Sequence, residues 1–276
     1  MVRHHNGDSV TVWVCGESVA VADAVFGEIV QRMPKSRPRN AIQDVQIWYN
    51  GNRGPQAKPV GIQAPTWKQI RRNYPPAVAS QLDVLMRFAR PTGRGKLILC
   101  HGEAGTGKTT AIRALARSWN RWCTTHYIAD PENFFNSTEY LLEVLGDADD
   151  RPVWRLLIAE DSDEFLRATA RREAGAALGR LLNLSDGILG QGTNTLILLT
   201  TNDDLDKLHP ALVRPGRCLA QIQFTRFTTA QATEWLPAGI RPPTDPPTLA
   251  ELVELANSNK RIRTGIAAVP NTGAYL

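Results

Sequence analysis

The stretch Lys96–Trp119 constrains the fold of this chain more than any other part of its sequence. Within it, Gly102–Thr109 reads GEAGTGKT and matches the pattern G-x-x-x-x-G-K-[ST] at every fixed position. The apolar run Lys96–Cys100 precedes this motif and predicts a strand buried on both faces, and a helix is predicted from Lys108 to Trp119. A strand, a glycine-rich turn and a helix in this order predict a loop that binds phosphate groups.

The chemistry of such a loop requires these residue types. Glycines let backbone N–H groups close around an anion without a clashing Cβ, and the first N–H groups of the following helix point at the phosphates. Lys108 would place its charge on the β- and γ-phosphates, and the Thr109 hydroxyl would be a ligand of Mg²⁺. ATP and Mg²⁺ are therefore the predicted cofactors. The residues expected to contact the nucleotide are Gly102, Glu103, Ala104, Gly105, Thr106, Gly107, Lys108, Thr109 and Thr110.

Apolar runs that alternate with helical patterns predict the fold from residue 63 onward. The helix expected before the loop is Ala77–Ala89, and the further strand candidates are Thr125–Ala129, Arg155–Ala159, Thr195–Thr200 and Gln221–Phe224. Strands that alternate with helices indicate an α/β fold with a mainly parallel sheet and helices on both faces. Two last helices, Thr229–Leu236 and Thr248–Asn257, predict only a reduced helical lid at the C-terminus.

Residues 1–62 are predicted to be a small, separate α+β module. Apolar residues alternate around Val10 and predict a strand, and they recur at helical spacing over Val19–Met33. Val45–Tyr49 is a second strand candidate, and Asn50–Pro59 has the composition of a turn and linker. We therefore expect three parts: this module, a nucleotide-binding core at 63–228 and the C-terminal lid at 229–276.

Carboxylates follow the strand candidate Arg155–Ala159. An ATP-hydrolysing loop needs one carboxylate for Mg²⁺ and another to orient the attacking water. Glu160 and Asp161 lie directly at the strand end, so Glu160 is assigned with Thr109 to the metal and Asp161 to the water. The alternative pair, Asp163-Glu164, has the more usual order but lies farther from the apolar run. In the favoured assignment Asp163 supports the site.

The run Thr200–Cys218 (TTNDDLDKLHPALVRPGRC) resembles the second region of homology of AAA proteins. Together with the phosphate-binding loop, it makes residues 63–228 similar to the AAA clade of the AAA+ superfamily of P-loop ATPases. Two shorter stretches, Leu157–Phe165 (LIAEDSDEF) and Leu178–Gly187 (LGRLLNLSDG), are most similar to the AAA group of the mitochondrial Rieske-protein translocase. The resemblance implies the AAA+ P-loop fold and ATP hydrolysis.

The resemblance also implies roles for three polar side chains. Asn202 would be the sensor that contacts the γ-phosphate and the water, whereas from the residues alone a cap of the next turn is the favoured interpretation. Arg214 and Arg217 would be arginine fingers acting on ATP bound to a neighbouring subunit, where a cation is worth about 10³–10⁵ in rate. Taken alone, these arginines would be surface residues beside a turn. Action in trans implies a ring of about six or seven identical subunits.

Two features of AAA proteins are not evident in the sequence. No second sensor arginine stands out; Arg226, Arg261 and Arg263 are candidates by residue type only. Phe134-Phe135 lie about where AAA translocases carry an aromatic pore loop. The alternative, which we favour, is that this pair packs in the core, and its use in stacking single-stranded nucleic acid has weak support.

Composition limits the partners and the location. The net charge is +5 and the pI about 9.2, which permits an acidic partner, but no basic block indicates a nucleic-acid arm. The four cysteines are scattered, and no apolar run approaches the roughly 18 residues that span a membrane. These features predict a soluble cytoplasmic protein without a membrane partner.

The function favoured by the sequence is that of a mechanoenzyme. ATP hydrolysis in a homo-oligomeric ring would remodel or translocate a macromolecule, above all a protein client selected by the N-terminal module. A nucleotide-dependent switch or assembly scaffold with slow turnover is the alternative. A nucleic-acid-directed ATPase is a weaker third interpretation, because it depends on the pI alone.

Overall fold

The computed structural model divides the chain into two compact units, Met1–Asn40 and Ala41–Leu276. It describes residues 2–5, 9–12, 14–32, 42–91, 95–146, 154–167, 194–204, 207, 208, 210, 212 and 216–257. The smaller unit contains the antiparallel strands β1 (Val2–His5) and β2 (Ser9–Val12), followed by the helix α1 (Val19–Arg32).

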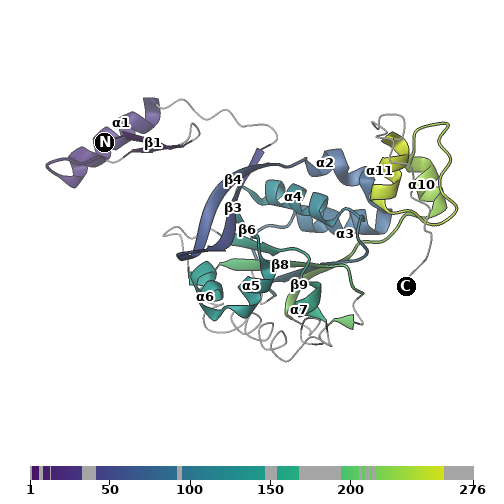
Figure 1. Cartoon of the computed structure of the whole chain (residues 1–276). Coiled ribbons are helices and arrows are strands. Elements are labelled where there is room, and N and C mark those ends of the chain that lie inside the picture. Colours follow the sequence, from purple (N-terminus) through teal and green to yellow (C-terminus); the bar gives the residue numbers. More distant parts are fainter. Residues whose placement is uncertain are drawn as a thin grey trace, which may run out of the picture. The chain divides into compact units, whose positions relative to one another are not determined.

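The larger unit is built on a seven-stranded sheet with the order β4-β3-β6-β7-β8-β5-β9 (Figure 1). Its strands are β3 (Ile42–Gly51), β4 (Gly54–Gln63), β5 (Leu97–His101), β6 (Cys123–Ile128), β7 (Trp154–Ala159), β8 (Thr195–Thr201) and β9 (Cys218–Gln223). Every neighbouring pair is parallel except the hairpin β3–β4. Parallel strands end at a common edge, so the loops that follow β5, β7 and β8 meet there.

Helices cover both faces of this sheet, as the sequence predicts (Figure 1). The first half of the unit contributes α2 (Trp67–Ile70), the 3-10 turn η1 (Arg71–Asn73), α3 (Pro76–Met86) and α4 (Lys108–Trp119). The second half contributes α5 (Pro131–Asn136), α6 (Thr138–Gly146) and α7 (Asp163–Leu166). One apolar core lies between the sheet and α3–α4, and the other between the sheet and α5–α7.

Side chains of β5 show how one strand serves both cores. Leu97 and Leu99 belong to the core under α5–α7, whereas Ile98 and Cys100 belong to the core under α3–α4. Adjacent residues of a strand point to opposite faces, so a strand that is covered on both sides must be apolar throughout. This explains the continuous apolar run that precedes the glycine-rich loop.

The boundary expected after residue 62 differs from the structural division after residue 40. The strand expected at Val45–Tyr49 is present, but it pairs in parallel with β6 and so belongs to the main sheet. The linker expected at Asn50–Pro59 is wrong, because its first two residues lie in β3 and the residues from Gly54 onward lie in β4. An edge strand tolerates Pro55 and Pro59, since one side of its backbone needs no partner in the sheet.

The aromatic pair Phe134-Phe135 lies in α5 and not in an exposed loop. The two side chains are 1% and 0% exposed. Their ring centroids are 5.4 Å apart, and Phe134 packs edge-on against Tyr140 of α6. The core-packing interpretation is therefore confirmed, and neither a pore loop nor a stacking platform is formed by these two residues.

Two short helices complete the described part of the chain. The predicted C-terminal helices are present as α10 (Thr229–Trp235) and α11 (Leu249–Asn257). They share a small apolar cluster that includes Phe227, Leu236 and Leu252. Within the part of the chain that the structure describes, no helix is long and apolar enough to cross a membrane.

Candidate active site

The glycine-rich loop joins β5 to α4 at the carboxyl edge of the sheet. Gly102 opens it with φ of 132°, and a Cβ added there would lie 2.1 Å from the carbonyl oxygen of Phe224. Only glycine fits such a close approach, so this position of the motif is also required by packing against the segment after β9. The Gly102 N–H donates to Thr201 O at the end of β8 over 3.2 Å, which joins the loop to the neighbouring strand.

The Lys108 ammonium lies within the loop and has three hydrogen-bond acceptors. It donates to Gly102 O over 2.6 Å, to Glu103 O over 3.1 Å and to Asn202 Oδ1 over 2.8 Å. Burial lowers the pKa of Lys108, and the charges of Asp161 and Asp163 oppose that shift. The predicted lysine and the predicted sensor asparagine are thus brought together, although 94 positions separate them in the sequence.

The two residues assigned to the metal are in direct contact. Thr109 Oγ1 donates to Glu160 Oε1 over 2.7 Å. Burial raises the pKa of Glu160, whereas the bond from Thr109 lowers it. Mg²⁺ takes hard oxygen ligands and is usually held by one or two protein groups together with water and phosphate oxygens. The hydroxyl and the carboxylate therefore fit Mg²⁺, and among the described residues no cluster of three or more His, Cys, Asp or Glu offers another metal site.

Asp161 is held in an unusual backbone conformation next to this pair. Its φ is 52°, in the left-handed region that non-glycine residues rarely adopt. Its N–H donates to Thr200 Oγ1 over 2.9 Å, which fixes the turn at the end of β7 to β8. Such strain persists where the surrounding structure determines the conformation, and it is concentrated at functional sites.

Asp163 orients the Asn202 amide. Its Oδ1 accepts hydrogen bonds from Thr201 Oγ1 (2.6 Å) and from the Asn202 N–H (2.7 Å), and its Oδ2 accepts one from Asn202 Nδ2 (3.3 Å). Partial burial raises the pKa of Asp163, but these bonds outweigh burial and lower it. With Nδ2 directed at Asp163, the amide oxygen faces Lys108. Glu164, the other member of the alternative acidic pair, is exposed in α7.

Of the two predicted arginine fingers, Arg217 lies among the described residues, and its backbone is placed by two hydrogen bonds. The carbonyl oxygen of Arg217 accepts hydrogen bonds from the N–H groups of Lys96 and Leu97, over 3.1 and 3.2 Å. Its backbone therefore lies at the start of β5, whereas the glycine-rich loop follows the end of that strand. Arg214 and the run Leu178–Gly187 lie outside the described residues, as do Arg261 and Arg263.

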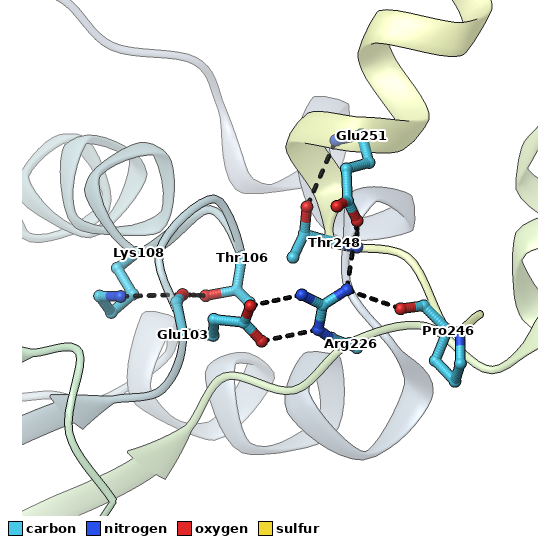
Figure 2. A network of polar contacts seen from close by, with 7 residues as sticks. All are labelled: Glu103, Thr106, Lys108, Arg226, Pro246, Thr248 and Glu251. Carbon is cyan, nitrogen blue, oxygen red and sulfur yellow. Dashed lines mark hydrogen bonds and ion pairs between the residues drawn. The ribbon is translucent and has the colours of Figure 1, made fainter. Parts of the chain in front are cut away.

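Contacts on the outer side of the loop were not foreseen from the sequence. Tyr74 OH donates to Gly107 O over 3.1 Å, and the Glu103 carboxylate pairs with Arg226 (Figure 2). The sequence showed only that Glu103 is a charged residue at a variable position of the motif. Arg226 was a candidate for the second sensor by residue type alone. Nothing in a linear sequence indicates that these two residues pair across 123 positions.

Two family matches cover most of the chain. Residues 98–226 match the ATPase family associated with various cellular activities (AAA), and residues 1–87 match a domain of unknown function (DUF5925). The second match extends through the smaller unit, the β3–β4 hairpin and α3.

Several known proteins are similar to about half of the chain. The 26S proteasome regulatory subunit 6B homolog of Aspergillus niger is 30% identical over 161 residues, which are 52% of this chain and 35% of the relative. Protein CdcH of Halobacterium salinarum is 32% identical over 133 residues, which are 46% of this chain and 17% of the relative. The mitochondrial chaperone BCS1 of Bos taurus is 32% identical over 165 residues, which are 52% of this chain and 37% of the relative. The chain thus spans well under half the length of these relatives.

A solved structure of an E. coli MS115-1 HORMA:CdnC:Trip13 complex is also similar, with 18% identity, a TM-score of 0.45, and 68% of this chain and 71% of the other covered. The sheet order, the glycine-rich loop and the family match identify the fold. Residues 98–226 form an ATPase domain of the AAA family, with the AAA+ P-loop NTPase fold.

Proposed function

We propose that this chain couples the binding and hydrolysis of Mg·ATP to the remodelling or translocation of a macromolecular client, a protein, within a homo-oligomeric ring. The observation that carries the proposal is the convergence of Lys108, Asn202 and Asp163 at the carboxyl edge of the sheet, beside the Thr109–Glu160 pair. These groups can hold a triphosphate, a magnesium ion and a water molecule next to one another.

Each side chain has a role in this proposal. The loop residues from Gly102 to Thr110 bind the phosphates, with Lys108 on the β- and γ-phosphates. Thr109 and Glu160 hold Mg²⁺, which when bound neutralises charge that develops on the phosphates. Asp161 orients the attacking water, and Asn202 contacts the γ-phosphate.

Arg214 and Arg217 are proposed to act on the nucleotide of a neighbouring subunit. The backbone of Arg217 lies at the opposite end of β5 from the P-loop of its own chain, which favours action in trans. Action in trans requires an oligomer, and we propose a ring of about six or seven subunits. The finer kinship with the Rieske-protein translocase group is supported by the order Glu160-Asp161. A cytoplasmic location is supported by the four scattered cysteines, which form no CxxC pair in the sequence.

A switch or assembly scaffold with slow turnover is the second candidate. It is favoured by the acidic order Glu160-Asp161, which is the reverse of the usual one, and by the short lid, which among the described residues consists of α10 and α11. The nucleic-acid-directed alternative gains no support from Phe134 and Phe135, because both side chains are buried.

The test is ATP turnover per subunit as a function of protein concentration. We expect the wild-type rate to rise with concentration as rings assemble, and the variants Lys108→Ala, Asp161→Asn and Arg214→Ala to abolish it. Glu164→Gln should leave it nearly unchanged. A rate that does not depend on concentration, combined with a silent Arg214→Ala, would exclude the ring mechanism. Slow turnover with normal nucleotide-dependent assembly would favour the switch.

A further inference from the structure

Arg226 connects the P-loop to the C-terminal helices. It lies between β9 and α10, and its Nε donates to Glu103 Oε2 over 2.6 Å while its Nη2 donates to Glu103 Oε1 (Figure 2). The third nitrogen, Nη1, donates to Pro246 O over 2.8 Å and to Glu251 Oε2 of α11 over 3.3 Å. A single guanidinium thus bonds both to the P-loop and to the segment that leads into α11. The forked geometry of arginine makes such a bidentate contact possible.

The start of α11 also contacts the P-loop directly. The N–H of Ala250 donates to Gly105 O over 2.9 Å. At Gly107, whose φ is 95°, an added Cβ would lie 2.8 Å from Leu249 Cδ2, so a side chain there would displace the Leu249 side chain of the helix. Because the P-loop binds phosphate through its inward N–H groups, these contacts to carbonyl oxygens and to the outer side leave the phosphate site open.

Glu103 contacts both Arg226 on the outer side of the loop and Lys108 on the inner side. Its carboxylate is held by Arg226, while its backbone carbonyl oxygen accepts hydrogen bonds from Lys108 Nζ (3.1 Å) and Thr106 Oγ1 (2.7 Å). A displacement of Glu103 would therefore move an acceptor of the lysine that contacts the phosphates. The positions of Arg226 and Lys108 are linked through one residue.

We propose that Arg226 is a positioning residue that holds the P-loop in its phosphate-binding conformation through Glu103, and that it couples nucleotide binding to the docking of α11. This inference rests on the proposed binding of ATP at the P-loop. By linkage, if docked α11 favours nucleotide binding, bound nucleotide must stabilise the docking of α11 by the same factor.

The expected size of the effect follows from exposure. The side chains of Arg226 and Glu103 are 37% and 54% exposed, so solvent screens the ion pair. The bidentate geometry and the contact to Glu251 strengthen the interaction. We expect loss of the Arg226–Glu103 pair to weaken nucleotide binding about three- to tenfold.

The experiment is a titration with a fluorescent ADP analogue of the wild type, Arg226→Gln, Arg226→Lys, Glu103→Gln and the double variant Arg226→Gln/Glu103→Gln. Arg226→Gln and Glu103→Gln should each weaken binding by that factor, and the double variant should be no weaker than either. Arg226→Lys should recover part of the affinity, because it keeps the charge and loses the fork. The matched control is Arg71→Gln, which removes the bidentate pair with Asp83 elsewhere in the unit.

A second readout separates coupling from a general loss of stability. Hydrogen exchange of residues 249–257 should slow when ADP binds to the wild type, and this protection should be reduced in Arg226→Gln. Unchanged affinity and unchanged protection in Arg226→Gln would overturn the inference alone, as would an equal loss of affinity in Arg71→Gln. Failure of the wild type to bind nucleotide would overturn the inference together with the proposed function.

Discussion

The inner and outer sides of the P-loop differ in how their contacts are built. On the inner side, Lys108 is 7% exposed and bonds to the loop and to Asn202 at the end of β8. On the outer side, Glu103 and Arg226 form an ion pair that solvent reaches. Buried charged contacts are strong and intolerant of change, whereas exposed pairs are screened and contribute little individually. The comparison indicates that the chemistry depends on the inner side and that the outer side only adjusts it.

The largest effect is expected for Lys108→Ala. Loss of the ammonium removes the charge that faces the β- and γ-phosphates, and we expect turnover to fall at least about a hundredfold. The matched control, Lys58→Ala on the exposed edge strand β4, should be silent in the same steady-state assay. Equal rates for Lys108→Ala and the wild type would remove the basis of the comparison.

A smaller effect is expected for Asp163→Ala. This change deletes the acceptor of Asn202 Nδ2 and leaves the amide free to rotate, so turnover should fall about tenfold while the affinity for ADP changes little. Single-turnover and binding measurements on the same preparation would separate the two quantities. A variant that loses affinity and turnover in parallel would show that Asp163 supports the loop rather than the sensor.

Glu160→Gln should affect activity and stability in opposite directions. Burial raises the pKa of Glu160, so the ionised carboxylate destabilises the nucleotide-free fold at neutral pH. The neutral amide removes this penalty, and Tm should rise while Mg²⁺-dependent turnover falls.

The pH dependence of Tm tests whether the pKa of Glu160 is raised in the folded state. A group with a raised folded-state pKa binds more protons when folded, so its destabilising effect is present above that pKa and disappears as the pH falls through it. The difference in Tm between Glu160→Gln and the wild type should therefore shrink as the pH falls from neutral toward the ordinary pKa of a glutamate. A difference that grows toward low pH would contradict the assignment of a raised pKa.

The smallest effect is expected for Glu251→Gln on the outer side. Its carboxylate accepts one bond from Arg226 over 3.3 Å and caps α11 through the Thr248 N–H over 2.6 Å. The amide oxygen of glutamine can still cap the helix, so affinity for ADP should fall less than about threefold. A loss as large as that of Lys108→Ala would mean that the two sides of the loop are equally important.

Local pattern was sufficient for much of the fold. The P-loop motif, the apolar runs of β5, β7 and β8 and the two C-terminal helices were predicted near their observed positions. These elements carry their own signals, because a strand covered on both faces must be apolar and a phosphate-binding turn must be rich in glycine. No local pattern indicates that the β3–β4 hairpin belongs to the main sheet, because this depends on the pairing of β3 with β6.

For this protein, the sequence by itself determined the kind of fold and identified the candidate residues for binding Mg·ATP. Only the tertiary structure decided that residues 42–63 extend the sheet, that Phe134 and Phe135 fill its core, and that Arg226 reaches Glu103. The physical reason is that a motif is specified by local backbone and charge requirements over a few residues. Partners in a sheet, a core or an ion pair depend instead on contacts between segments that are distant in the sequence.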